Sequence, residues 1–155
     1  YATTPEPDNP EYPLQGLAAR MREKLAGCAP AIRAIAEQIT VDERVVYRPL
    51  EAIFLEGPWY KGRMVLLGDA VHATTPHLGQ GGGMAIEDAV VLAEELVRTE
   101  GVKGAFPAYR RRRFERCRYV FEKSLEICRG QLGKGPLIDN ARAGADMSAL
   151  LAEPI

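Results

Sequence analysis

Residues 68–89 read GDAVHATTPHLGQGGGMAIEDA, and this stretch decides the fold of the chain. A short apolar run, MVLL at residues 64–67, comes directly before it and predicts a strand buried on both faces. Apolar positions at helical spacing follow it and predict a helix over residues 82–98 that ends before Gly101. The order of strand, GD pair, loop, glycine-rich turn and helix predicts an α/β fold.

The three consecutive glycines of this stretch, Gly81, Gly82 and Gly83, stand where the helix should begin. Each costs up to about 1 kcal/mol relative to alanine in a helix, so a positive φ or a close approach of the backbone to a ligand should explain them. The start of a helix also presents unpaired N–H groups and a partial positive charge. We therefore expect an anion or an electron-rich ring edge to dock there. A tight turn without a ligand is the alternative.

The rest of the chain is predicted from local signals. Four prolines within residues 1–13 indicate an extended arm, and two short helices are expected to meet near Gly27, the second beginning at Pro30. Residues 45–47 and 53–55 are rich in β-branched and aromatic side chains, which favours strands or extended segments. A longer helix is predicted from Pro107 to the glycines after residue 129, and a weak helical stretch covers residues 147–152.

Composition excludes several classes of function. The 155 residues carry a net charge of -1, so neither nucleic acid nor an anionic membrane is indicated as a partner. Cys28, Cys117 and Cys128 are odd in number and lack a CxxC spacing, which argues against a disulfide framework and against a metal site. No apolar run reaches the roughly 20 residues that a membrane span needs, and no signal peptide is evident. We expect a soluble, cytoplasmic protein with free thiols.

Residues 68–89 resemble the second flavin-binding motif of the class A FAD-dependent aromatic-ring monooxygenases, which have the p-hydroxybenzoate hydroxylase fold and include salicylate, 6-hydroxynicotinate and urate hydroxylases. Arg63 before the strand and Pro107-Ala108-Tyr109 before an arginine-rich helix agree, and the resemblance covers most of residues 41–130. It implies FAD as cofactor, NADH or NADPH as co-substrate, and O2. The reaction implied is hydroxylation of a small aromatic or heteroaromatic substrate through a flavin hydroperoxide.

The resemblance also implies roles for single residues. Asp69 would hydrogen-bond a ribityl hydroxyl of FAD, and Pro76 would lie beside the isoalloxazine ring with its carbonyl facing the substrate. The backbone amides of Gly82 and Gly83 would meet the pyrimidine edge of the flavin, although many family members have asparagine where Gly83 stands. The cofactor-binding set is completed by Gly68, Gly79, Gln80 and Gly81.

Pro76 and His77 are the catalytic candidates. By the resemblance His77 lies at the mouth of the flavin and substrate cavity, where acid–base or substrate-orienting work is conceivable near neutral pH. A partly exposed loop histidine is the alternative. His72 is interpreted as structural.

Other charged groups near the motif receive structural interpretations. Glu87 and Asp88 are expected to favour the dipole of the helix that carries them. The six arginines at positions 110–113, 116 and 118 predict a solvated, salt-bridged helix rather than a nucleic-acid or NADPH-phosphate site. Met64 and Met84 are assigned to the core.

Two family motifs are absent from the sequence: a GxGxxG fingerprint for the ADP half of FAD, and an Asp-Gly pair. We therefore expect the C-terminal part of a two-domain enzyme, with a partial substrate-binding domain at 1–58, an FAD-domain strand and helix at 59–101, and a helical segment at 102–155. Alone it should bind FAD weakly and be inactive, needing the missing N-terminal half or a partner chain. The sequence does not decide whether the enzyme forms a homodimer. A flavin-dependent epoxidase or reductase, and a non-catalytic subunit that docks on a partner, are the alternatives.

Overall fold

The computed structural model describes residues 11–155, which fall into two compact units on either side of the bond between Leu50 and Glu51. The extended arm predicted for residues 1–13 lies almost wholly outside the described residues. Within those described residues, no helix is both long and apolar enough to cross a membrane. Each unit is described by itself below.

The N-terminal unit contains the two predicted short helices, α1 (Leu17–Leu25) and α2 (Pro30–Ala36), followed by a 3-10 turn, η1 (Asp42–Arg44). Pro30 stands at the start of α2, where its missing N–H costs no helical hydrogen bond. The start of α1 has no cap from its own first residues. Instead Asp42 accepts hydrogen bonds from the backbone N–H groups of Gly16 and Ala18, each at 2.8 Å.

The cap that Asp42 provides should be lost in acid. Hydrogen bonds from the Gly16 and Ala18 amides lower the pKa of Asp42, so its contribution is complete above the unfolded value of about 3.9 and disappears as pH falls through the lower folded pKa. We expect the amide NMR signals of Gly16 and Ala18 to titrate together with a midpoint below about 3.9. Asp42→Asn should abolish this titration, and a midpoint at or above that value in the parent chain would contradict the cap.

The larger unit, residues 51–155, contains one hairpin of two short strands. β1 (Tyr60–Lys61) pairs antiparallel with β2 (Met64–Val65), with Tyr60 opposite Val65 and Lys61 opposite Met64. The prediction of a strand at residues 64–67 buried on both faces is wrong, because Met64 is 70% exposed and Leu66 is 41% exposed. Within residues 11–155, β1 is the only strand beside β2, so no further sheet covers these side chains.

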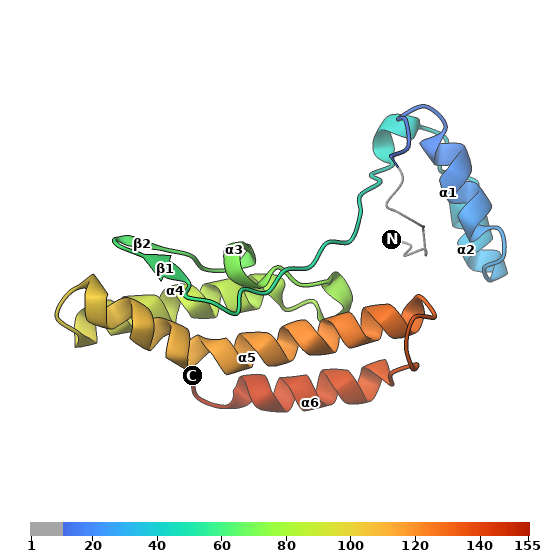
Figure 1. Cartoon of the computed structure of the whole chain (residues 1–155). Helices are drawn as coiled ribbons and strands as arrows, with labels where there is room; N and C mark the ends of the chain where they lie inside the picture. The colour runs from blue at the N-terminus through green and yellow to red at the C-terminus, as the bar shows by residue number, and fades with distance from the viewer. Residues whose placement is uncertain (1–10) are drawn as a thin grey trace. The chain divides into compact units, whose positions relative to one another are not determined.

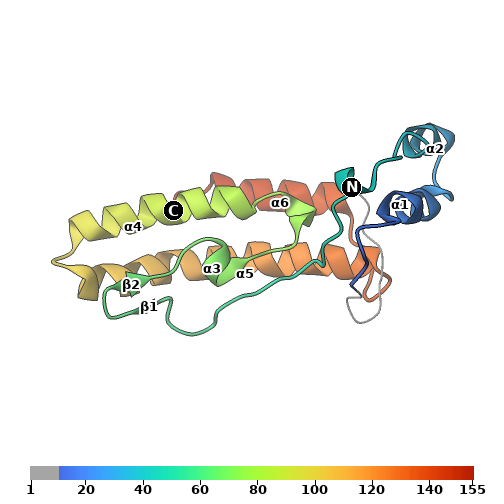
Figure 2. The ribbon, with the colours of Figure 1, turned by 90° about the horizontal axis from the view of Figure 1, so that it is seen from above.

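Helices make up most of this unit. A one-turn helix, α3 (Asp69–His72), and a 3-10 turn, η2 (Pro76–Leu78), lead into α4 (Gly81–Arg98). The chain then runs back along α4 in the long α5 (Val102–Gln131), and α6 (Asn140–Ala152) returns along α5, as Figures 1 and 2 show. The hairpin, α3 and the three long helices form the mixed α/β arrangement that the sequence predicted.

The predicted start of α5 was wrong, and that of α4 was one residue late. α5 begins at Val102, so Pro107 lies inside the helix. A proline there removes one hydrogen bond near the helix start. Burial of the neighbouring Phe106 and Tyr109 against the core holds this turn in place.

The core of the larger unit lies around Trp59, which is fully buried. Its indole Nε1 donates to the carbonyl of Leu55 at 2.8 Å, and buried side chains from α3 to α6 surround it. Residues 53–55 are extended without forming a strand, and the amides of Ile53 and Leu55 donate to the carbonyls of Ala73 and Val71 at 2.9 Å. The segment before the hairpin is therefore attached directly to α3.

Candidate functional site

The GD pair forms a turn that packs directly on α4. Gly68 has φ 58° and ψ -140°, a conformation that glycine alone adopts without strain. A Cβ at this position would lie 3.0 Å from the Cβ of Ala85, closer than two side chains tolerate. Glycine is required here for both reasons, and the turn between β2 and α3 is thereby fixed against the second turn of α4.

Asp69 is the first residue of α3, and its carboxylate faces the start of α4. A Cβ built on Gly81 would lie 4.0 Å from Oδ1 of Asp69 and 3.7 Å from Cγ2 of Thr74. The Asp69 side chain is exposed, and no hydrogen bond joins it to another residue within 11–155. An acceptor without a partner thus stands beside a helix start.

The start of α4 is open. The residue before the helix, Gln80, makes no capping hydrogen bond with its side chain, so the first N–H groups have no side-chain acceptor. Gly81, Gly82 and Gly83 do not have positive φ, which rules out the first of the two predicted reasons for these glycines. A Cβ on Gly83 would lie 3.3 Å from Oε1 of Gln80, whereas a Cβ on Gly82 would meet nothing within 4 Å. The open space beside Gly82 would admit a ligand close to the backbone.

The loop that carries Pro76 and His77 lies between α3 and α4. Pro76 is exposed at the start of η2, and Gly79 ends this turn with φ 65°. His77 is half-buried. Burial lowers the pKa of His77, an effect that the Gln131 side chain of α5 partly opposes. The imidazole is therefore neutral at pH 7.

Two buried hydroxyl groups stand next to this loop. Oγ1 of Thr74 and Oγ1 of Thr75 are shielded from solvent and have no hydrogen-bond partner among the described residues. Unpaired buried polar atoms are uncommon in folded proteins and need a reason. Their position beside Pro76 places three kinds of unused polar group around the same loop: hydroxyls, the Asp69 carboxylate and the amides of α4.

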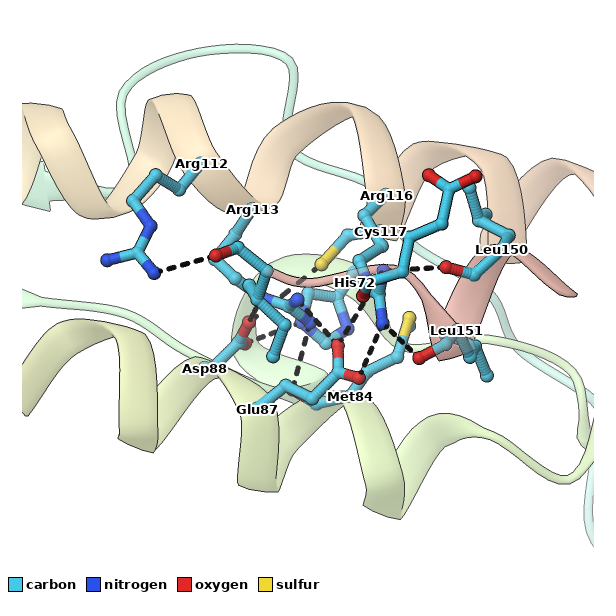
Figure 3. A network of polar contacts seen from close by, with 12 residues as sticks. His72, Met84, Glu87, Asp88, Arg112, Arg113, Arg116, Cys117, Leu150 and Leu151 are labelled. Carbon is cyan, nitrogen blue, oxygen red and sulfur yellow. Dashed lines mark hydrogen bonds and ion pairs between the residues drawn. The ribbon is translucent and has the colours of Figure 1, made fainter. Parts of the chain in front are cut away.

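A cluster of buried charges lies behind this site (Figure 3). Oδ2 of Asp88 accepts from the backbone N–H of Gly68 at 2.8 Å and lies 2.7 Å from Nε2 of His72, and Oδ1 accepts from Nε of Arg113 at 2.7 Å. Asp88, His72 and Arg113 are all fully buried. Burial alone would raise the pKa of Asp88, but hydrogen bonds from His72, Gly68 and Arg113 hold it below its usual range.

Asp88 therefore does not serve the helix dipole, as the sequence suggested. Its carboxylate bonds the buried Arg113 guanidinium, the His72 ring and the Gly68 amide. The sequence did carry a signal for this. Asp88 stands four residues after Met84 and three before Val91, on the helix stripe that faces α5. Arg113 occupies the equivalent stripe of α5 between Tyr109 and Cys117. Opposite charges on two facing apolar stripes indicate a buried pair.

The arginines of α5 are salt-bridged, as predicted, but not all are solvated. Arg113 also bonds Glu87 at 2.6 Å, and Arg116 bonds the same carboxylate at 3.0 Å. Arg112 pairs with Glu94 and Glu95 of α4 at 2.7 and 2.6 Å. These contacts fix α5 against α4, and Glu87 serves them rather than the helix dipole.

The donor atoms of His72, Asp88 and Cys117 lie within 4.8 Å of one another, a spacing that a metal could use. The chemistry disfavours a metal there. Burial raises the pKa of the Cys117 thiol to about 12, so in the metal-free protein this side chain is a neutral thiol. The guanidinium of Arg113 already holds the carboxylate of Asp88. The three residues act as a buried polar cluster.

Several known proteins contain segments that are similar to this chain. Residues 36–124 match the family described as FAD binding domain. YetM of Bacillus subtilis strain 168, whose name places it among FAD-dependent monooxygenases, is 39% identical over 117 residues, which is 76% of this chain and 31% of that protein. The FAD-dependent urate hydroxylase of Klebsiella pneumoniae subsp. pneumoniae is 33% identical over 72% of this chain and 29% of its own length.

A solved structure also contains a segment with the same fold as this chain. The R204Q variant of Klebsiella pneumoniae HpxO complexed with FAD superposes with a TM-score of 0.76 and 30% identity, over 97% of this chain and 38% of that one. The chain thus spans about a third of the length of the relatives it matches. The matched segment contains the GD turn, the loop before α4 and the charge cluster behind them. The chain belongs to the family described as FAD binding domain.

Proposed function

We propose that this chain is the C-terminal part of an FAD-dependent monooxygenase and that residues 68–83 form the ribityl and pyrimidine side of its FAD site. The observation that carries the proposal is the open helix start at Gly82. Gly82 has ordinary φ and no neighbour within 4 Å among residues 11–155, as Gly144 of α6 also has. Gly82 alone of the two, however, stands in the first turn of a helix where the N–H groups have no side-chain acceptor. A flat ligand lying against the backbone would explain it.

The residues present fit this cofactor. The unpartnered carboxylate of Asp69 can accept a hydrogen bond from a ribityl hydroxyl, and the free amides of Gly82 and Gly83 can donate to the pyrimidine edge. Gly68, Gly79, Gln80 and Gly81 shape the turns that hold these groups. The helix start would also favour negative charge on the reduced ring.

FAD, when bound, would take electrons from NADH or NADPH and allow O2 to transfer one oxygen atom to the substrate while the other leaves as water. The carbonyl of Pro76 and the neutral imidazole of His77 would face the substrate, His77 as an acceptor for an acidic proton. We propose a small electron-rich aromatic or heteroaromatic substrate. Urate is the first to test because two relatives, 33% and 32% identical, are named FAD-dependent urate hydroxylases.

The remaining assignments follow from the same proposal. Residues 1–58 would belong to the substrate-binding domain, 59–101 to the FAD domain and 102–155 to a C-terminal helical segment. Without a GxGxxG sequence the ADP half of FAD has no partner in this chain, so the chain alone would bind FAD weakly. Exposed apolar side chains on α4, such as Ile86 at 70% and Val97 at 88%, would be covered by the rest of the protein. Buried free thiols fit a cytoplasmic location.

Oxygen uptake by the complete protein tests this function. The protein would be supplied with FAD and either NADH or NADPH, and then with urate, hydroxylated benzoates or simple alkenes. We expect oxygen consumption that depends on an aromatic substrate and yields a product with one added hydroxyl. Epoxide formation from the alkenes would instead indicate an epoxidase, and a complete protein that binds no flavin would indicate a non-catalytic docking subunit.

A further inference from the structure

We propose that Asp88 is a positioning residue that sets the place of Asp69 relative to the start of α4. Its carboxylate is buried within the unit and joins three segments to the helix that carries it: the GD turn through Gly68, the end of α3 through His72, and α5 through Arg113. A role of Asp88 in flavin binding rests on the proposed function, whereas its role in holding the GD turn and α3 against α4 does not.

The contacts of Asp88 fix both ends of α3. Gly68 is the residue before α3, and His72 is its last residue. A helix of one turn is unstable by itself, because nucleation costs more than its few hydrogen bonds return. Both ends are held by the same oxygen, Oδ2 of Asp88, at 2.8 and 2.7 Å. Asp69 lies between these two anchors, so the backbone position from which its carboxylate projects is held by Asp88.

Asp88 also belongs to the helix whose start is open. It lies two turns beyond Gly81, on the same rigid element. The acceptor at Asp69 and the donors at the start of α4 are thus parts of one assembly whose internal spacing Asp88 sets. A ligand that must meet both groups at once depends on that spacing.

The charge of Asp88 is needed for this arrangement. Four donors converge on its two oxygens: the N–H groups of Gly68, His72 and Arg113, and the thiol of Cys117. An asparagine has one acceptor oxygen, so its amide nitrogen would face either Arg113 or the pair formed by Gly68 and His72. Asp88→Asn keeps the size of the side chain and releases one set of contacts.

Glu87 provides the matched control. It is the neighbouring acidic residue, and it also bonds Arg113, at 2.6 Å, and Arg116, at 3.0 Å. Its side-chain hydrogen bonds go to these two arginines and not to Gly68 or His72. Glu87→Gln therefore weakens the ion pairs between α4 and α5 without releasing the GD turn.

Two readouts on the complete protein test the proposal: FAD affinity from flavin fluorescence, and amide hydrogen exchange of residues 68–72. We expect Asp88→Asn to weaken FAD binding at least about tenfold and to speed exchange in residues 68–72 by a similar factor, while Glu87→Gln changes each by less than about threefold. Equal FAD affinity in Asp88→Asn and the parent protein, or equal losses in both variants, would overturn the proposal.

A second pair of variants covers the case in which Asp88→Asn does not fold. His72→Gln retains an N–H donor toward Asp88, whereas His72→Leu removes it. We expect His72→Leu to speed exchange in residues 68–72 and His72→Gln to restore most of the protection. Should the parent protein bind no FAD, the proposed function fails, but exchange still decides the positioning role. If hydrogen exchange became faster evenly over α4 and α5, that result would contradict the positioning role of Asp88.

Discussion

Replacing Arg113 with alanine is expected to lower the free energy of unfolding by about 3–5 kcal/mol, because it leaves a buried carboxylate without its cation. Arg113 is fully buried, and its guanidinium contacts Asp88 at 2.7 Å and Glu87 at 2.6 Å. It also donates to the carbonyl of Met84 at 3.3 Å. Urea unfolding of the complete protein, followed by circular dichroism, measures the loss.

A partly exposed arginine on the same helix is the control. Arg118 pairs with Glu115 at 2.6 Å, and the two side chains are 39% and 72% exposed. Arg118→Ala should change the free energy of unfolding by no more than about 1 kcal/mol. Adding Asp88→Asn to Arg113→Ala should recover part of the stability, because it removes the unpaired charge. A loss below about 1 kcal/mol for Arg113→Ala would mean that the buried cluster does not hold α4 and α5 together.

Replacing Trp59 with alanine is expected to cost about 3–5 kcal/mol, the range for removing a large buried aromatic side chain. Trp59 is fully buried, and its ring lies 5.8 Å from that of Tyr109 and 5.9 Å from that of Phe114, between centroids. Its removal would open a cavity between the segment before the hairpin and α5. Urea unfolding of the complete protein checks the size of the loss.

Trp59→Phe separates the two contributions of this residue. Phenylalanine keeps an aromatic ring in the core but cannot donate to the carbonyl of Leu55, which the indole does at 2.8 Å. Its cost should be clearly smaller than that of Trp59→Ala. Equal losses for the two variants would show that the hydrogen bond, and not the packing, carries the contribution of Trp59.

The helices were predictable because their signals are local. Pro30 and Gly101 mark a helix start and a helix end through their own backbone chemistry, and the apolar spacing after Gly81 needs no knowledge of its neighbours. The glycines are informative for a similar reason. Three glycines at a helix start cost stability wherever the chain folds, so the sequence alone predicts that either a ligand or a tight turn accounts for them.

What could not be predicted depends on contacts between distant segments. An apolar run such as residues 64–67 shows that the side chains favour burial but not what covers them, and β2 has only β1 beside it within residues 11–155. The run of arginines in the sequence shows where positive charges lie on α5, but not which acidic residues they pair with. Whether Arg113 is solvated or buried depends on the facing stripe of α4, where Asp88 and Glu87 lie.

Gly82→Ala tests the central claim, that the open start of α4 holds flavin, most directly. No atom of residues 11–155 lies within 4 Å of the added methyl group and φ is not positive, so the substitution should stabilise the protein by about 0.4–1 kcal/mol. The methyl group would enter the space assigned to the ring, so FAD should bind at least about tenfold more weakly to the complete protein.

Gly144→Ala in α6 is the matched control, because it too adds a methyl group to a helical glycine with nothing within 4 Å. It should stabilise the protein to a similar degree and leave FAD affinity unchanged. The decisive measurement is therefore the FAD dissociation constant of the two variants beside that of the parent protein. We expect weaker binding in Gly82→Ala alone, and equal binding in all three proteins would contradict a flavin site at the start of α4.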